Sequence, residues 1–290
     1  MSNIEVAGLN YYPIKSCGAV AAEEVSFSEF GIEHDREWML VGSKGQFLSQ
    51  RTHPKLALVQ TRIEDNHLKA VAPDMGELII SLEEDPEAEI VAVDLWKKPG
   101  SGTLVSPEAN SYFTDYLGKD ARLLRIKQSR DIKPECRVEG ASERTAFADG
   151  FPILLASTSS LDALNAHLDQ PITVDRFRPN IVIEGAQAYD EDYWREVRIG
   201  NLRAFVVRAC DRCPMPNIDQ QIGELPKERP VTEALRVTRQ GIDKLNGETG
   251  EFFGQNMTHV FEPGLTIKVG DTVSVMERAE ERNIDMSVIT

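Results

Sequence analysis

The sequence predicts a mainly β protein of the α+β class with a few helices. Three observations lead to this prediction. The N-terminal third consists of short β-rich segments separated by Gly, Asp and Asn, two helical patterns follow in the middle, and β-rich segments then return. The spacing of the first strands indicates a barrel or a sandwich. With 290 residues, the chain is long enough for one large domain or two medium ones.

The expected N-terminal strands are short, apolar and bounded by turn residues. A turn at 43–45 joins REWMLVG to QFLSQ, and a turn at 65–67 joins LALVQTRIE to LKAVA. The other expected strands of this region are GLNYYPIK, ELIISL and AEIVAVDLW. The segment at 97–102 is rich in Gly and Pro, which indicates a local break in the chain's organisation.

Two segments in the middle of the chain have the signals of helices. In SPEANSYFTDYLG, Ser106 can cap the N-terminus, Pro107 fits the first turn and Gly118 can end the helix. Its apolar face consists of Phe113, Tyr116 and Leu117. The second segment, STSSLDALNAHL, follows the apolar run FPILLA and has leucines at helical spacing, namely Leu161, Leu164 and Leu168.

The C-terminal part again favours strands. These are PNIVIEG, EVRIGNLRAFVVRA with a hairpin turn at 200–203, and LTIKVGDTVSVM. The acidic segment at 189–194 is expected to be solvated, because the protein as a whole is acidic. After Met276 the chain is charged, and we expect a helical or frayed tail.

The composition excludes several classes of protein. There are 32 basic and 47 acidic residues, and the net charge of −15 opposes binding to nucleic acid or to an anionic membrane surface. No apolar run has the length needed to span a bilayer. The N-terminus lacks the basic and apolar segments of a secretory signal, so we expect a cytoplasmic protein whose four cysteines are thiols.

Cys210 and Cys213 have a C-x-x-C spacing directly after an apolar run. This spacing fits half of a zinc site, a redox disulfide, or a single thiolate ligand with a neighbouring cysteine. The second pair of zinc ligands is missing, and Pro214 and Pro216 predict a loop where a redox pair would begin a helix. Two small buried hydrophobic residues are an equally good interpretation of the spacing alone.

Five segments in this order resemble a known family. YYPIKSCG, GIEHDREWMLV, FRPNIVI, RACDRCPMPNID and FFGQN are similar to the MOSC-domain proteins that carry molybdenum cofactor, in particular to the mitochondrial amidoxime reducing component family and its bacterial relatives. The resemblance implies an N-terminal MOSC β-barrel domain at 1–105, a MOSC domain at 106–278 packed against it and with a β-barrel of its own, and a tail at 279–290.

The same resemblance implies a set of site residues. Cys213 is expected to be catalytic as the one protein ligand of molybdenum, and a soft thiolate suits this metal. The pterin phosphate or ring is assigned to Lys15, Ser16, Arg36, Arg178 and Asn180, with Asp211, Arg212 and Asn256 beside it. Two positions depart from the family pattern, since relatives have Ser where Asp211 stands and Tyr where Asn256 stands.

The resemblance also implies an activity, the reduction of small N-hydroxylated or N-oxygenated compounds at the molybdenum cofactor. The sequence has no C-x-x-x-x-C-x-x-C run, and four cysteines cannot serve both molybdenum and a plant-type iron–sulfur cluster. Electrons are therefore expected from a separate donor protein, a reductase with a small electron carrier. Two alternatives stay open: a carrier of the cofactor or of a Cys213 persulfide, and a scaffold with structural cysteines.

Overall fold

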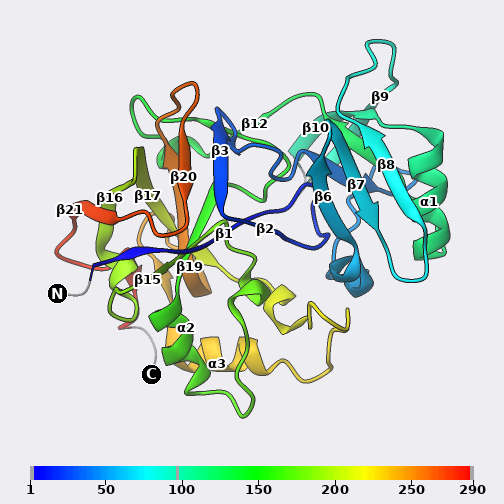
Figure 1. Cartoon of the computed structure of the whole chain (residues 1–290). Coiled ribbons are helices and arrows are strands. Elements are labelled where there is room, and N and C mark those ends of the chain that lie inside the picture. Colours follow the sequence, from blue (N-terminus) through cyan, green and yellow to red (C-terminus); the bar gives the residue numbers. More distant parts are fainter. Residues whose placement is uncertain (1–2, 96–97, 288–290) are drawn as a thin grey trace.

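The computed structural model describes residues 3–95 and 98–287, in which strands predominate over helices (Figure 1). The predicted mainly β class is confirmed. The largest sheet has ten strands, and smaller sheets of two to four strands surround it. In Figure 1 the ten-stranded sheet lies on the left, and the strands of the N-terminal region lie with helix α1 on the right. None of the helices in the described residues has the length and apolar composition needed to cross a membrane.

The N-terminal region contains two antiparallel sheets. One has the order β5-β11-β10-β9, formed by Trp38–Val41, Arg122–Ile126, Lys98–Leu104 and Ile90–Leu95. The other is a meander of β6, β7 and β8, formed by Gln60–Glu64, His67–Val71 and Glu77–Ser81. The break expected at 97–102 is wrong for residues 98–102, because these residues belong to β10 and pair with β9. Residue 97 lies outside the described residues.

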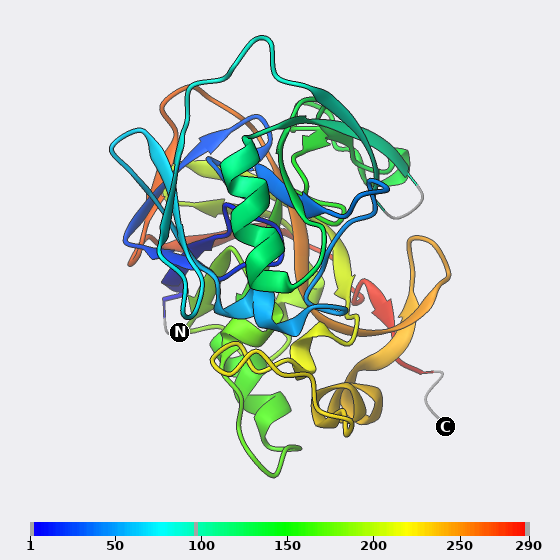
Figure 2. The same ribbon diagram turned by 90° about the vertical axis from the view of Figure 1, so that its right-hand side faces the viewer.

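Helix α1, Pro107–Leu117, forms where the sequence predicts it. Ser106 Oγ accepts a hydrogen bond of 3.1 Å from the backbone N–H of Ala109, and Gly118 ends the helix in the left-handed conformation at φ 69°. Phe113 and Leu117 are buried in the core that the two N-terminal sheets share. Figure 2 shows α1 lying across these sheets.

The ten-stranded sheet supplies the framework of the C-terminal region. Its main path is β2-β1-β15-β14-β19-β17-β16-β21, formed by Val20–Ala22, Glu5–Tyr11, Ile181–Glu184, Ile153–Ser157, Thr249–His259, Leu202–Asp211, Trp194–Ile199 and Val273–Arg278. Its other two strands, which join the path through β19, are β18 at Gln240–Asp243 and β22 at Ile284–Asp285. The smaller strands nearby are β3 at Glu24–Ser28, β4 at Gly31–Ile32, β20 at Thr266–Lys268, β12 at Arg130–Asp131 and β13 at Arg144–Thr145.

The sheet curls back on itself. Val6 N in β1 donates to Asp271 O at 2.9 Å, and Ile4 O just before β1 accepts from Val273 N at 2.8 Å. These bonds connect the N-terminal strand to the start of β21. An isolated bridge joins Glu5 to Thr272. Among the described residues no continuous ladder closes the ring, so the expected barrel is present as a curled sheet.

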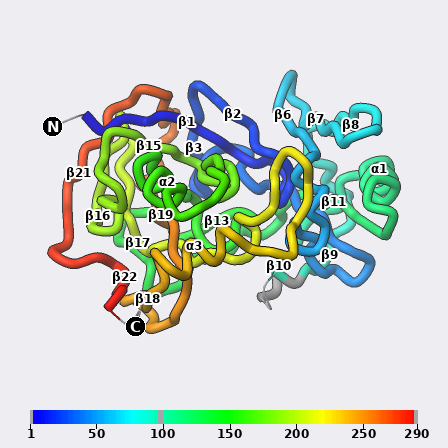
Figure 3. Tube along the Cα trace, turned by 90° about the horizontal axis from the view of Figure 1, so that it is seen from below, coloured from blue at the N-terminus to red at the C-terminus, as the bar shows by residue number. Residues whose placement is uncertain are grey.

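Helices α2, Thr158–Asn165, and α3, Pro230–Arg239, lie next to each other (Figure 3), below this sheet in the view of Figure 1. The first was expected, although it ends before Leu168. Helix α3 was not expected, although its buried residues Val231, Ala234 and Leu235 have helical spacing. Both helices share a small apolar core with Phe177 and Phe253, whose stacked rings are 3.9 Å apart.

Two expectations for the C-terminal part are wrong. The acidic segment at 189–194 is not solvated throughout, because Glu191 and Asp192 are each only 1% exposed. Asp192 accepts two hydrogen bonds from Arg239, each of 2.9 Å, and a paired charge can be buried. The segment after Met276 forms no helix as far as residue 287, where the described residues end, since β21 continues to Arg278 and β22 pairs with β18.

Strands cross between the two expected domains. Strand β11 lies beyond residue 105 but pairs with β5 and β10, while β1 and β3 lie before it but pair with β15 and β20. The boundary at residue 105 stays a prediction. The N-terminal segment therefore pairs with strands of both regions. Some of its residues lie near the end of β17, beside the candidate site.

Candidate functional site

A cavity of about 590 Å³ opens beside the end of β17. Its wall combines residues from the N-terminal segment, from the linking segment at 127–137 that follows β11, and from the strands of the ten-stranded sheet. The structure brings all nine sequence-predicted site residues to this one cavity. They are Lys15, Ser16, Arg36, Arg178, Asn180, Asp211, Arg212, Cys213 and Asn256.

The cavity is basic although the protein is acidic. Eight cations and four carboxylates line it, whereas the whole chain carries a net charge of −15. The cations are Lys15, Arg36, Arg51, Arg130, Lys133, Arg178, Arg208 and Arg212, and the carboxylates are Asp131, Asp149, Asp211 and Glu248. Such a concentration of positive charge attracts an anionic ligand.

Cys213 follows the end of β17 in a short, well-anchored loop. The backbone N–H of Arg212 donates to Glu251 O at 2.8 Å, and Asn217 Nδ2 donates to Pro214 O at 3.0 Å on the other side. The Cys213 thiol is free and partly exposed, and none of the described residues forms a hydrogen bond with it. The loop therefore presents an uncommitted soft ligand to the cavity.

Cys210 is held by its neighbours. Arg212 Nη1 donates to Cys210 Sγ at 2.9 Å, and the thiol itself lies 3.7 Å from the carbonyl oxygen of Asp211. Burial raises the pKa of the Cys210 thiol. The two cysteines form no disulfide, and the described part of the chain contains no group of three or more His, Cys, Asp or Glu residues that could hold a metal ion.

Tyr12 lies between two arginines of the cavity. The guanidinium carbons of Arg36 and Arg178 are each 4.2 Å from the centre of its ring. Arg36 Nη1 also donates to Asp35 Oδ2 at 2.5 Å. Arg178, which is 7% exposed, has no carboxylate within ion-pair distance among the described residues, and its buried Nη2 makes no hydrogen bond.

The surroundings of Arg178 favour the binding of an anion. Burial lowers the pKa of its guanidinium to about 10, because the charged form has lost most of its contact with water. The backbone at Arg36 and Arg178 is left-handed, at φ 51° and 56°, which is uncommon for residues other than glycine. A buried cation with an unused N–H group is costly unless a ligand completes its hydrogen bonds.

Asn180 shapes the cavity through contacts within the protein. Its Oδ1 accepts hydrogen bonds of 3.1 Å from Arg36 Nη1 and from the backbone N–H of Leu154, and its Nδ2 donates to Asn10 O at 3.2 Å. The amide is thus already engaged on both sides. The structure therefore assigns Asn180 the positioning of Arg36.

Lys15 is a nearly buried ammonium paired with an exposed carboxylate. Its Nζ donates to Asp149 Oδ1 at 2.5 Å, and burial lowers the pKa of the ammonium. Ser16 follows with φ 71°, and Gln50 Nε2 fixes its carbonyl oxygen at 2.8 Å. The turn at 14–18 therefore points cationic and polar groups into the cavity from the N-terminal side.

Arg212 and the two departures from the family pattern complete the wall near Cys213. Arg212 Nη2 donates to Phe177 O at 2.8 Å, while its buried Nε lacks a partner. Burial, followed by the charge of Glu251, raises the pKa of Asp211. Asn256 Nδ2 lies 3.4 Å from the carbonyl oxygen of Ala209 on the adjacent strand.

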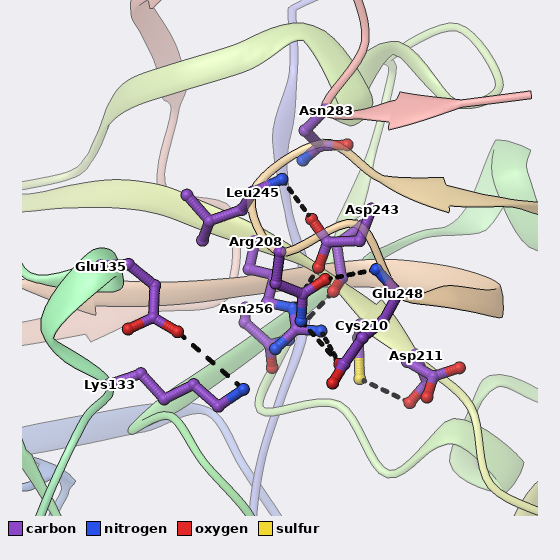
Figure 4. A network of polar contacts seen from close by, with 12 residues as sticks. Lys133, Glu135, Arg208, Cys210, Asp211, Asp243, Leu245, Glu248, Asn256 and Asn283 are labelled. Carbon is purple, nitrogen blue, oxygen red and sulfur yellow. Dashed lines mark hydrogen bonds and ion pairs between the residues drawn. The ribbon is translucent and has the colours of Figure 1, made fainter.

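Several cavity residues were not predicted. Figure 4 shows one of them, Arg208, bound to Asp243 and Glu248 beside Cys210. Arg130 and Lys133 enter from the linking segment. A signal for these two was present, since the stretch 122–137 of this acidic chain holds a concentration of cations, Arg122, Arg125, Lys127, Arg130, Lys133 and Arg137.

The donor set of the cavity fits a phosphate-bearing cofactor with a soft metal. The orphaned N–H groups of Arg178 and Arg212 suit phosphate oxygens, because guanidinium donors match them in geometry. The thiol of Cys213 suits a metal that brings its remaining ligands with it. The cavity volume of about 590 Å³ is within the range of small-molecule and cofactor sites.

Comparison with known proteins identifies the family of the chain. Residues 3–120 match the MOSC N-terminal beta barrel domain, and residues 142–274 match the MOSC domain. Mitochondrial amidoxime-reducing component 1 of Xenopus laevis is 30% identical over 280 residues, which cover 92% of this chain and 81% of that protein. Mitochondrial amidoxime reducing component 2 of Bos taurus is 29% identical over 286 residues, covering 93% and 83%.

A crystal structure of the YuaD protein of Bacillus subtilis aligns with 94% of this chain and 97% of its own, at 11% identity and a TM-score of 0.39, and this similarity is too low to support an argument. The two matched domains and the 30% identity over most of the chain establish the family without it. The chain therefore belongs to the family of MOSC proteins with an N-terminal MOSC beta barrel domain that includes the mitochondrial amidoxime-reducing components.

Proposed function

We propose that this protein is a molybdenum cofactor-dependent oxidoreductase that reduces N-hydroxylated and other N-oxygenated compounds with electrons from a separate protein. The observation that carries the proposal is the presence of two groups without hydrogen-bond partners in the same cavity. These are the free Cys213 thiol and the buried Arg178 guanidinium with its orphaned Nη2. The names of the amidoxime-reducing relatives supply the substrate class.

Each end of the cavity has a separate task in this proposal. Cys213 provides the protein thiolate to molybdenum, and Lys15, Arg36 and Arg178 provide cations for the pterin phosphate or ring. When bound, the cofactor supplies two-electron oxygen-transfer chemistry, so an N-hydroxy compound, two electrons and two protons give an amine or amidine and water. The nine predicted site residues retain their predicted roles as proposals, and Asn180 in addition positions Arg36.

The protein contributes rigidity around the reacting centre. Arg212 is fixed by Cys210 Sγ and Phe177 O, and the η5 turn at Met215–Asn217 closes the loop behind Cys213. A ligand held on a loop between a strand and a turn keeps its direction, which is what an open metal coordination site requires. Electron delivery by a reductase with a small carrier protein and a cytoplasmic location remain part of the proposal.

The test is analysis of the purified protein for molybdenum and pterin, followed by turnover of benzamidoxime. With reduced viologen, the isolated protein is expected to form benzamidine. With NADH or NADPH alone it is expected to be inactive, and a reductase with a small electron carrier should restore turnover. Protein that contains molybdenum and pterin but fails with viologen on several N-oxygenated substrates would favour the carrier alternative. Protein that binds neither would contradict both.

A further inference from the structure

Asp149 lies among three cations at the N-terminal side of the cavity. Its carboxylate is 2.5 Å from Lys15 Nζ, and its charge also acts on Arg36 and Arg130. All four residues line the same cavity. An anion is therefore already present where three cations converge, and the protein itself supplies it.

The two members of the Lys15–Asp149 pair differ sharply in exposure. The side chain of Lys15 is 7% exposed and that of Asp149 is 64% exposed. A buried ammonium needs an anionic partner, because its water has been removed. A largely exposed carboxylate, in contrast, can leave the pair and recover its hydration at little cost. The lysine is fixed, and the aspartate is the exchangeable partner.

The segment that carries Asp149 is suited to such an exchange. It lies at 146–152, between β13 and β14, where the chain forms no helix or strand. Arg130 Nη1 donates to the carbonyl oxygen of Ala148 at 2.7 Å, so the segment is anchored at the residue before Asp149. The side chain can therefore move away while the backbone beside it stays in place.

The charges of the cluster favour a dianion. Lys15, Arg36 and Arg130 are positive, while Asp149 and the Asp35 that pairs with Arg36 are negative, so one positive charge remains. A phosphate dianion in place of Asp149 brings the same cluster to neutrality. Phosphate also offers three acceptor oxygens, more than one carboxylate presents.

We propose that Asp149 is a displaceable counterion that occupies a phosphate subsite formed by Lys15, Arg36 and Arg130. A phosphate monoester dianion enters this subsite, takes over the hydrogen bond from Lys15 and releases Asp149 to solvent. The inference rests on the proposed function only in identifying that phosphate as part of the cofactor. The counterion also keeps buried Lys15 paired while the subsite awaits its ligand.

The test uses the full chain, produced in a host that makes no molybdenum cofactor, and inorganic phosphate as the probe. Asp149→Asn keeps the side-chain shape and removes the competing charge. If Asp149 occupies the subsite about nine-tenths of the time, its removal tightens phosphate binding roughly tenfold by isothermal titration calorimetry. Without phosphate, the melting temperature of Asp149→Asn is expected to fall below that of the wild type, and phosphate should restore it.

Two variants make the result specific. Asp131→Asn removes another exposed carboxylate that lines the cavity and pairs with Arg137, so it controls for net charge and should leave the phosphate Kd within about twofold. Lys15→Gln added to Asp149→Asn should abolish the tighter binding. Unchanged or weaker phosphate binding by Asp149→Asn, equal tightening in Asp131→Asn, or tight binding that survives Lys15→Gln would each overturn the proposal.

Phosphate binding does not depend on turnover, so the two proposals fail separately. An inactive but molybdenum-loaded protein in which Asp149→Asn binds phosphate more tightly contradicts only the proposed activity. An active protein in which phosphate binding is insensitive to Asp149 contradicts only the counterion.

Discussion

Arg36 Nη1 donates a hydrogen bond of 3.1 Å to Asn180 Oδ1 and so joins two residues that are 144 positions apart in the sequence. The same Asn180 oxygen accepts from the backbone N–H of Leu154, and the amide nitrogen donates to Asn10 O. One buried side chain thus connects strands β14 and β15 to strand β1 and to the turn that carries Arg36. The position of Arg36 in the cavity therefore depends on how the N-terminal region packs against the ten-stranded sheet.

Asn180→Ala is expected to lower the free energy of unfolding by about 1–3 kcal/mol, because it leaves the Leu154 N–H without its side-chain acceptor and removes one of the acceptors of the Arg36 guanidinium. Pterin occupancy should fall with it. Urea denaturation and pterin analysis of the same preparation measure both effects. Asn180→Asp keeps the acceptor oxygen, so the Arg36 contact should survive. Unchanged stability in the alanine variant would show that Asn180 does not position Arg36.

Cys213→Ser is expected to remove molybdenum-dependent activity almost completely, since an alcohol donates less charge to the metal than a thiolate. Cys210→Ser should keep bound metal, because Cys210 Sγ contacts Arg212 within the protein. Molybdenum content and viologen-driven turnover are the two measurements. Equal loss of molybdenum from both variants, or near-normal turnover of Cys213→Ser, would refute a single protein ligand.

Arg178→Met is expected to separate cofactor binding from stability. Each charge-assisted hydrogen bond to phosphate contributes about 1.5–3 kcal/mol, so the cofactor affinity should fall by about one to two decades. The melting temperature of the cofactor-free protein should not fall, because the variant removes a buried charge that has no carboxylate partner among the described residues. Arg176→Met, which removes an arginine paired with Asp219 at 2.7 Å, is the matched control. Full occupancy with a collapsed melting temperature would make Arg178 structural.

The parts of the fold that were predicted correctly have local signals. Ser106, Pro107 and Gly118 fix the ends of α1 within thirteen positions of each other. Ser106 acts through its side-chain oxygen, and Pro107 and Gly118 act through their backbone geometry. The buried pair of Asp192 and Arg239 spans 47 positions, and nothing in the acidic segment alone reveals the distant cation. A local pattern predicts where an element begins and ends, but it does not identify the partner across the core.

The candidate site shows the same division. The C-x-x-C spacing and the short family segments point to Cys213 and Arg178, and both residues line the cavity. Asp149 lies outside these segments, and Arg208, the first residue of one of them, is given no role by it. Each acquires its significance from a partner far away, Lys15 for the first and Asp243 for the second. The nine predicted residues share a cavity, and their roles toward a cofactor stay predictions until binding is measured.

Asp192→Ala is expected to destabilise the protein by about 3–5 kcal/mol, because it leaves Arg239 as an unpaired charge in the core. Gln255 Nε2, which donates to Asp192 Oδ1 at 2.8 Å, would also lose its acceptor. Urea denaturation measures the loss. The double variant Asp192→Ala with Arg239→Met should recover part of it, since no charge is then left buried. A loss below about 1 kcal/mol would mean that water reaches Arg239.

Glu191 is expected to make stability depend on pH between about 4.5 and 7. Burial raises the pKa of its carboxyl from 4.5 to about 7, although Ser160 Oγ donates to Oε1 at 2.6 Å. In this window the folded state holds a proton that the unfolded state has released, so stability falls as pH rises and the favourable contribution is lost above about 7. The shift corresponds to about 3 kcal/mol. Glu191→Gln should therefore flatten the profile, with its largest gain in stability relative to the wild type at pH 8, as followed by urea denaturation at pH 5 and pH 8.

The same substitution at exposed Glu139 controls for the lost charge. Parallel pH profiles for wild type and Glu191→Gln would show that the buried carboxyl does not hold a proton in the folded state.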